Sequence, residues 1–120
     1  MIQKRNNRKT GSLYEEKAVE YLTEQGIRVI EANYRCRIGE IDMIAEDGPT
    51  LVFVEVKYRK TGRSGSAAEA VGRQKQERIY RCAQVYMKYH GISFLRPVRF
   101  DVLAMDNMEI TWIQNAFGGM

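Results

Sequence analysis

The sequence predicts a single α/β domain with a mixed β-sheet flanked by helices on both faces. Two apolar segments flank a turn signal at residues 47–50, which is typical of a β-hairpin. Helical patterns precede and follow this hairpin, and two further strand patterns complete the chain. With 120 residues the chain can build one hydrophobic core but not two.

The first helix is predicted from about Leu13 to Gln25, with Gly26 as its stop. Ser12 and Glu15 have the spacing of a capping box, with Ser12 as the N-cap. Glu15 therefore has two interpretations: a capping residue, or a carboxylate at the edge of the buried stripe that points toward the hairpin. A short β-branched strand follows at residues 27–34.

A hairpin centred between Gly48 and Pro49 places Asp42 opposite Glu55 and Glu40 opposite Lys57. Side chains alternate along a strand, so the two faces can be separated. The apolar face, which must be core, holds Ile41, Met43, Ala45, Val52, Val54 and Val56. The other face holds Glu40, Asp42, Ile44, Phe53, Glu55 and Lys57.

Two carboxylates directly opposite each other in a sheet repel, so Asp42 and Glu55 need a cation between them. Mg²⁺ or Mn²⁺ is one candidate, because hard divalent ions prefer carboxylate oxygens and water. Lys57 is the other, and it would reduce the cluster to a salt bridge on the strand surface. The spacing alone leaves both interpretations open.

Basic residues gather in two segments that could contact phosphates. The arm at residues 1–12 carries Lys4, Arg5, Arg8 and Lys9 before any acid occurs, and the other fifteen basic residues equal the acids in number, so the arm accounts for the net charge of +4. The loop after Lys57 carries Arg59, Lys60 and Arg63. The alternatives are a solvated terminus and a plain surface connection.

A second helix is predicted from a capping box at residues 66–69 to about Tyr89, ending at Gly91, with Gly72 as a break in its first turns. Lys75 lies one turn before the apolar Ile79 and so flanks the buried face; it is either a phosphate contact or part of a solvated face.

Two strands, at residues 96–105 and 108–114, precede a tail at residues 115–120. Asp101 alternates with apolar neighbours on the first of these strands. It is either a further acid of the site or the partner of an arginine, and we favour the structural role.

Several classes of protein are excluded or disfavoured. Cys36 and Cys82 form no CxxC pattern and His90 is the only histidine, so a standard zinc site is excluded and a disulfide scaffold is disfavoured. No apolar segment approaches the ~20 residues of a membrane helix, and the basic N-terminus lacks the apolar region of a signal peptide. We expect a cytoplasmic protein that does not engage a membrane.

The order of elements and acids resembles the restriction-endonuclease-like core with its PD-(D/E)xK signature, in which Ile41 replaces the proline. More specifically, the chain resembles the YraN-like bacterial family. The matching stretches are residues 15–22, 33–35, 39–42, 53–57, 68–71, 99–102 and 115–117, together with Lys75. That family is related to archaeal Holliday-junction resolvases, which share a helix glutamate, an aspartate and a Glu-x-Lys pair.

The resemblance implies a Mg²⁺- or Mn²⁺-dependent endonuclease that hydrolyses phosphodiester bonds in DNA, with branched or recombination-related DNA as substrate. Asp42, Glu55 and Glu15 would hold the metal and, with Lys57, form the catalytic set. The sequence leaves open whether the protein assembles into a homodimer. A non-catalytic nucleic-acid-binding protein that keeps the nuclease fold is the alternative, and an adaptor for a protein partner is a third interpretation.

Overall fold

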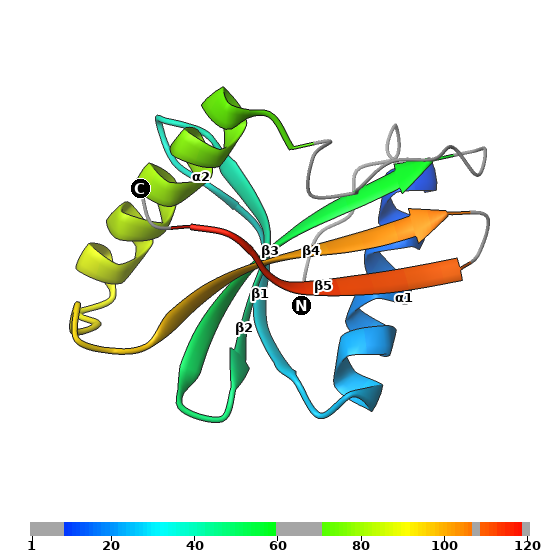
Figure 1. The fold of residues 1–120 in the computed structure, drawn as a ribbon, viewed down its shortest axis with the longest axis horizontal. Helices are drawn as coiled ribbons and strands as arrows, with labels where there is room; N and C mark the ends of the chain where they lie inside the picture. Colours follow the sequence, from blue (N-terminus) through cyan, green and yellow to red (C-terminus); the bar gives the residue numbers. More distant parts are fainter. Residues whose placement is uncertain (1–8, 60–70, 107–108, 119–120) are drawn as a thin grey trace.

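The computed structural model describes residues 9–59, 71–106 and 109–118. Within these ranges, helices and strands follow one another in the order that the sequence predicts (Figure 1). Their bounds are α1 (Lys9–Glu24), β1 (Arg28–Arg35), β2 (Glu40–Asp47), β3 (Thr50–Arg59), α2 (Arg73–Tyr89), β4 (Val98–Asp106) and β5 (Glu109–Phe117).

The strands of this part of the chain form one five-stranded sheet in the order β1-β2-β3-β4-β5. Neighbouring strands are antiparallel except β3 and β4, which are parallel. A parallel pair needs a long crossover connection, and the segment between β3 and β4 contains α2. The sheet is therefore mixed, as predicted.

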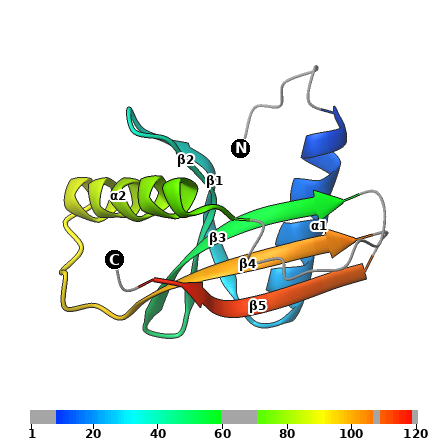
Figure 2. The same ribbon diagram turned by 45° about the horizontal axis from the view of Figure 1, so that its top comes forward.

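The two helices cover opposite faces of this sheet (Figures 1 and 2). On one face, Ile79, Cys82 and Tyr86 of α2 pack with Ile44 and Phe53. On the other, Ala18 and Leu22 of α1 pack with Met43, Val54 and Leu103. A strand covered on both faces must be apolar on both, as β3 is from Leu51 to Val54. The α/β class is confirmed, and the arrangement is consistent with a restriction-endonuclease-like architecture.

The predicted hairpin register is confirmed near the turn and ends before the charged residues. Backbone pairing of β2 with β3 runs from Asp47↔Thr50 to Met43↔Val54. The predicted pairs Asp42–Glu55 and Glu40–Lys57 would come next, but β2 separates from β3 there. Glu40 stays paired with Arg35 of β1 and forms an ion pair with it at 3.2 Å, so its predicted pairing with Lys57 is wrong.

Ile41 lies on the face opposite to the predicted one. Met43, Ala45, Val52 and Val54 pack on the α1 side as expected, whereas Ile41 joins Ile44 in the cluster under α2. Strict alternation holds only for a straight ladder, and β2 follows β1 alone beyond Met43.

The first helix begins at Lys9, earlier than the predicted Leu13. Residue 12 lies inside α1, so Ser12 is not its N-cap and the capping-box interpretation of Glu15 is wrong. The Ser-x-x-Glu spacing does not mark a helix start by itself, because both residues are also tolerated within a helix.

The second helix begins at Arg73 after an extended Gly72, in agreement with a break at that glycine. The predicted capping box at residues 66–69 lies outside the described residues. At the C-terminal end, β5 continues to Phe117, so residues 115–117 are strand rather than tail. The Phe117 ring stacks on Phe100 at 5.5 Å, which anchors this end against β4.

In the ranges that the structure describes, no helix combines the length and apolar character that crossing a membrane requires.

Candidate active site

The candidate site lies where β2 and β3 separate. Without a β2 backbone partner, the Val56 N–H donates instead to the Asp42 carboxylate, at 2.8 Å from Oδ2. A side chain thus takes the place of a ladder carbonyl and keeps the buried N–H satisfied. The separation of the strands therefore fixes the Asp42 carboxylate against β3.

Glu55 reaches the same place from β3. Its neighbours Val54 and Val56 pack on the α1 side. Because side chains alternate along a strand, Glu55 points to the α2 side, and it is only 4% exposed there. The two carboxyl groups are neighbours, because the charge of Glu55 and a side-chain hydrogen bond with it both act on the pKa of Asp42. The predicted meeting of Asp42 and Glu55 is therefore formed through their side chains, although their backbones do not pair.

The cation beside this pair is Lys75, from the first turns of α2. Its Nζ lies 2.6 Å from Glu55 Oε2, and its side chain remains 41% exposed. Lys75 therefore joins the buried carboxylates to the molecular surface. The sequence placed this lysine at the flank of the buried face, but did not predict that it would pair with Glu55.

Burial and the negative charge of Glu55 raise the pKa of Asp42 from 3.8 to about 7, while the Val56 N–H and Lys75 oppose this rise. Burial opposes the charge of Lys75, but its hydrogen bond to Glu55 and the charges of Glu55 and Asp42 outweigh it and raise the pKa of Lys75. Near neutral pH the Asp42 carboxyl therefore readily gains or loses its proton, next to the ion pair of Glu55 with Lys75.

Lys57 lies two residues beyond Glu55, so alternation puts it on the same face. Among the described residues, no carboxylate forms an ion pair with it; the salt bridge predicted from the sequence is made by Lys75 instead. The adjacent Tyr58 turns to the other face, where its ring stacks on Tyr14 of α1 at 4.2 Å. This stack fixes the end of β3 that carries Lys57.

Glu15 approaches from α1 and contacts the edge strand β1. The Asn33 side-chain amide donates to Glu15 Oε1 at 3.1 Å. Asn33 lies between the pairs Ala32↔Met43 and Tyr34↔Ile41, level with Asp42, and has a left-handed backbone with φ of 57°. Asparagine adopts this conformation more readily than most residues. This propensity and the family match of residues 33–35 are the signals in the sequence for its special position.

The structure brings Asp42, Glu55 and Lys75 into contact and leaves Glu15 on Asn33. Within the described ranges, no three His, Cys, Asp or Glu side chains lie close enough together to hold one metal ion. A shell of two carboxylates is compatible with Mg²⁺, which usually keeps several waters and binds through one or two carboxylates and substrate phosphates. That Glu15 completes the shell stays a prediction.

Most of the predicted phosphate-contacting residues cannot be placed. Lys4, Arg5, Arg8, Lys60 and Arg63 lie outside the described residues. Lys9 and Arg59 belong to α1 and β3, but only their backbones are described. Lys75 is the one member of the set with a described side chain, and it points to Glu55.

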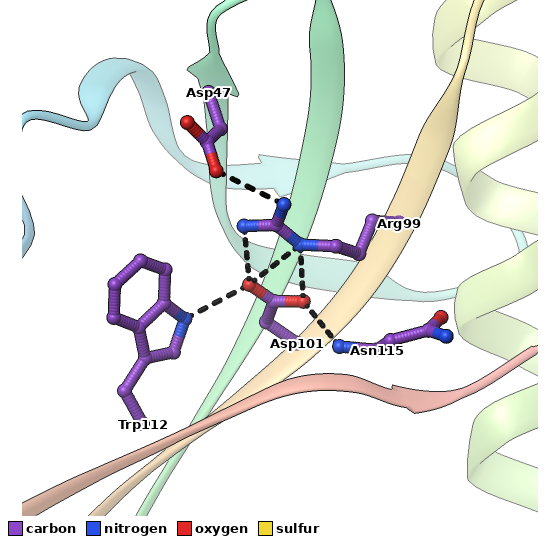
Figure 3. Close-up of polar contacts among 5 residues, drawn as sticks. All are labelled: Asp47, Arg99, Asp101, Trp112 and Asn115. Atoms are coloured by element: carbon purple, nitrogen blue, oxygen red, sulfur yellow. Dashed lines mark hydrogen bonds and ion pairs between the residues drawn. The ribbon is translucent and has the colours of Figure 1, made fainter.

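Asp101 has the structural role that the sequence favours (Figure 3). It is fully buried, and its carboxylate accepts hydrogen bonds from Arg99 at 3.0 Å, Trp112 Nε1 at 2.9 Å and the Asn115 N–H at 2.8 Å. Arg99 also donates to Asp47 at 3.0 Å. Asp101 is level with Val54 on the parallel strand, which places it on the α1 side of the sheet, away from Glu55.

Burial opposes the charge of Arg99, but its hydrogen bonds to Asp101 and Asp47 outweigh burial and raise its pKa further above its usual value. The arginine therefore stays charged and compensates the buried aspartate. This cluster ties β4 to β2 and β5, and it supplies no free carboxylate for a ligand.

Comparison with known proteins identifies close relatives along nearly the whole chain. One relative, a UPF0102 protein from Janthinobacterium sp. strain Marseille, is 44% identical over 106 residues, which cover 88% of this chain and 85% of that protein. Another, from Lachnoclostridium phytofermentans, is 45% identical over 112 residues, covering 93% and 95%. A UPF0102 protein from Methylococcus capsulatus is 46% identical over 111 residues, covering 89% of each chain.

The family model of the uncharacterised protein family UPF0102 matches residues 14–105. This range runs from α1 through β4 and includes Glu15, Asp42, Glu55, Lys57 and Lys75. On this match and on the identity of its relatives, the chain belongs to the uncharacterised protein family UPF0102.

Proposed function

We propose that this protein is a metal-dependent endonuclease that hydrolyses phosphodiester bonds in DNA, with branched or recombination-related DNA as its substrate class. One observation carries the proposal: Asp42 and Glu55 meet, largely buried, at the point where β2 and β3 separate. A sheet has no structural need for two adjoining carboxyl groups there, and their repulsion disfavours the arrangement.

The carboxylate pair fits a hard divalent cation. Burial and the charge of Glu55 raise the pKa of Asp42 although Lys75 opposes the rise, so a second cation beside the pair would favour the charged form of Asp42. Asp42 and Glu55 would hold Mg²⁺ or Mn²⁺, and Glu15 would complete the shell from the side of Asn33. When bound, the ion supplies charge stabilisation for the reacting phosphate and lowers the pKa of a bound water.

The two lysines have separate roles in this proposal. Lys57 has no ion pair among the described residues and lies on the face of Glu55, so its ammonium can orient the attacking water and compensate the charge that develops on the phosphate oxygens. Lys75 holds Glu55 in place, and because its side chain is partly exposed, its ammonium can also attract the DNA backbone.

The sequence supports the same reaction by resemblance. The YraN-like family is related to archaeal Holliday-junction resolvases and to the PD-(D/E)xK nucleases, which share the helix glutamate, the aspartate and the Glu-x-Lys pair. The basic arm and the basic loop after β3 add phosphate-binding capacity. These are arguments by analogy of motif and fold, so activity must be measured.

A non-catalytic nucleic-acid-binding protein is the second candidate, and the Lys75–Glu55 contact is the observation that favours it. That ion pair, at 2.6 Å, neutralises Glu55 without a metal, so the site can also be stable as an internal salt bridge. The basic arm would serve this function equally well.

The test is nicking of a four-way DNA junction, compared with linear duplex, with Mg²⁺ or Mn²⁺. Lys57→Ala removes a group that acts on the transition state more than on binding. We expect junction affinity within a few-fold of the unchanged protein and cleavage reduced by roughly 10²–10³. Lys88→Ala, an exposed lysine in the last turn of α2, is the matched control and should cleave normally.

Junction binding without cleavage by the unchanged protein, in either metal, would support the binding module and end the nuclease proposal. If the unchanged protein neither binds nor cleaves the junction, the interpretation as an adaptor for a protein partner remains. If Lys57→Ala and Lys88→Ala behave alike in a protein that does cleave, the catalytic role of Lys57 is wrong while the nuclease proposal stands.

A further inference from the structure

The two cysteines of this chain lie in contact although 46 positions separate them, with 2.9 Å between Cys36 Sγ and Cys82 Sγ. Cys36 belongs to the connection between β1 and β2, and Cys82 lies on the buried face of α2. Both are free thiols. A pair of buried thiols is often only packing, so the surroundings of the two sulfur atoms decide what the pair can do.

The β1–β2 connection lies against α2 at this point (Figures 1 and 2). The Cys36 N–H donates to the Gly39 carbonyl at 2.9 Å, and the Cys82 thiol donates to the same carbonyl at 3.6 Å. The Ile38 N–H donates to Cys36 Sγ at 3.4 Å. A short turn thus presents the Cys36 sulfur to Cys82, and the backbone fixes it from two sides.

The two thiols differ in access and in acidity. Cys36 is half-buried, whereas Cys82 is fully buried. Burial alone would raise the pKa of Cys36, but its contacts with Cys82, Gly39 and Ile38 hold that pKa below its usual value. Burial and the contact with Cys36 raise the pKa of Cys82 to about 12. The more accessible sulfur is also the one that more readily becomes a thiolate, which is the reactive form.

We propose that Cys36 and Cys82 form a reversible redox pair, which a hydroperoxide converts into an intramolecular disulfide that ties the β1–β2 connection to α2. This inference does not depend on the nuclease activity. It rests on the contact of two thiols from two elements, one accessible and one buried.

The reaction balances as follows. The Cys36 thiolate attacks one oxygen of the hydroperoxide, the O–O bond breaks, and an alcohol or water leaves with a proton from solvent. Cys36 is then a sulfenic acid. The Cys82 sulfur attacks the Cys36 sulfur, the S–OH bond breaks, and the departing hydroxide takes the Cys82 proton as water. The two thiols lose two electrons, and the peroxide gains them. A dithiol restores both thiols by exchange.

The cross-link would enclose β2, β3 and the first half of α2, which carry Asp42, Glu55 and Lys75. Closing a loop of this size reduces the freedom of the unfolded chain. We expect the oxidised protein to melt at a temperature higher by about 5 °C or more than the reduced protein.

The experiment uses the full chain, reduced and then freed of reductant. Hydrogen peroxide is added in steps, and remaining thiols are trapped with N-ethylmaleimide under denaturing conditions for intact-mass analysis. We expect both thiols to disappear together, with the loss of two hydrogen atoms, a monomeric product, one cross-linked peptide pair and full reversal by dithiothreitol.

Cys82→Ser is the matched variant, because it should accumulate a sulfenic acid on Cys36 that dimedone traps. In Cys36→Ser, Cys82 should remain alkylatable. Three outcomes with the unchanged protein would each show that the proposal is wrong. In the first, Cys36 is oxidised to sulfinic acid while Cys82 stays alkylatable; in the second, the disulfide links two chains. In the third, both thiols survive a peroxide concentration that oxidises free cysteine. The readout is mass, so failure of the nuclease proposal leaves this test intact.

Discussion

At the scale of single residues, Asp42 has the most unusual position in the described part of the chain. Its carboxylate accepts the Val56 N–H that the end of the ladder leaves without a backbone partner, and it also adjoins Glu55. The first contact favours the charged form and the second favours the neutral one. Burial and the charge of Glu55 prevail, and the pKa of Asp42 rises to about 7.

This shift gives the first prediction, for protein free of divalent metal. Between about pH 4 and pH 7 the folded chain keeps a proton on Asp42 that the unfolded chain releases, because the unfolded pKa is 3.8. The free energy of unfolding should therefore fall as pH rises through this interval, by roughly 2–4 kcal/mol, since one pKa unit corresponds to about 1.4 kcal/mol. Asp42→Asn cannot titrate, so its unfolding free energy should change less between pH 5 and pH 7.5.

Urea unfolding at the two pH values measures this effect. Glu46→Gln is the matched control, since Glu46 also lies on β2. Hydrogen bonds from Arg96 and Arg28 lower the pKa of Glu46 from its ordinary value of 4.5, the direction opposite to the shift of Asp42. The control should therefore keep the fall in unfolding free energy between pH 5 and pH 7.5 that the unchanged protein shows. Equal dependence in Asp42→Asn and the unchanged protein would refute the raised pKa of Asp42.

At the scale of elements, the end of α1 shows how local sequence terminates a helix. Gly26 has a left-handed backbone with φ of 88°, and the Ile27 N–H reaches back to the Leu22 carbonyl at 2.9 Å. This return closes the last turn and directs the chain into β1. Ala18 and Leu22 hold α1 in the core, and this turn connects α1 to β1. The turn therefore determines where β1 lies relative to the site.

Gly26→Ala should lower the free energy of unfolding by about 1 kcal/mol, because the left-handed conformation is unfavourable with a Cβ even where space is open. Gly39→Ala is the control: Gly39 has no left-handed backbone, and an added Cβ would meet only Arg78, at an ordinary contact distance of 3.7 Å. Chemical denaturation of both variants checks this. A Gly26→Ala variant no less stable than Gly39→Ala would contradict the assigned backbone strain.

At the scale of the whole molecule, the sheet separates two chemistries. The α1 face carries the Asp101 cluster, whose carboxylate is saturated by donors, and the α2 face carries Asp42 and Glu55, whose carboxylates adjoin each other. The net charge of +4 equals the four basic residues of the N-terminal arm, of which Lys4, Arg5 and Arg8 precede α1 and Lys9 begins it. Under the nuclease proposal, these basic residues would attract DNA toward a site whose own carboxylates are negative.

If the arm binds phosphate, removal of residues 1–8 should weaken junction binding and make its salt dependence shallower by up to about 3 in the logarithmic slope, because Lys4, Arg5 and Arg8 are lost. Fluorescence anisotropy over a range of salt concentrations measures both. A full-length variant with glutamine at these three positions should match the deletion, which separates charge from chain length. An unchanged slope in both would mean that the arm is only a solvated terminus.

The sequence by itself determined the features that depend on neighbouring residues along the chain. Alternation and the turn at residues 47–50 predicted the hairpin register, which holds from Asp47↔Thr50 to Met43↔Val54. They also predicted that Asp42 and Glu55 meet, and this contact forms through the side chains rather than the backbones. The glycine stop ended α1, and the resemblance of the motifs indicated the family that the family model shows. A turn and a left-handed glycine are local properties, so they depend little on the rest of the molecule.

Only the tertiary structure decided which groups surround the carboxylate pair. Lys75 neutralises Glu55 because α2 packs over β3, and Lys57, although nearer in sequence, does not. Glu40 pairs with Arg35, and Ile41 changes face, because β2 leaves β3 and follows β1. The contact of Cys36 with Cys82 depends on the same packing of α2. These outcomes rest on long-range burial competing with local pattern. The partners Glu55 and Lys75 are 20 positions apart and Cys36 and Cys82 are 46 apart, so no short window of the sequence contains both members of either pair.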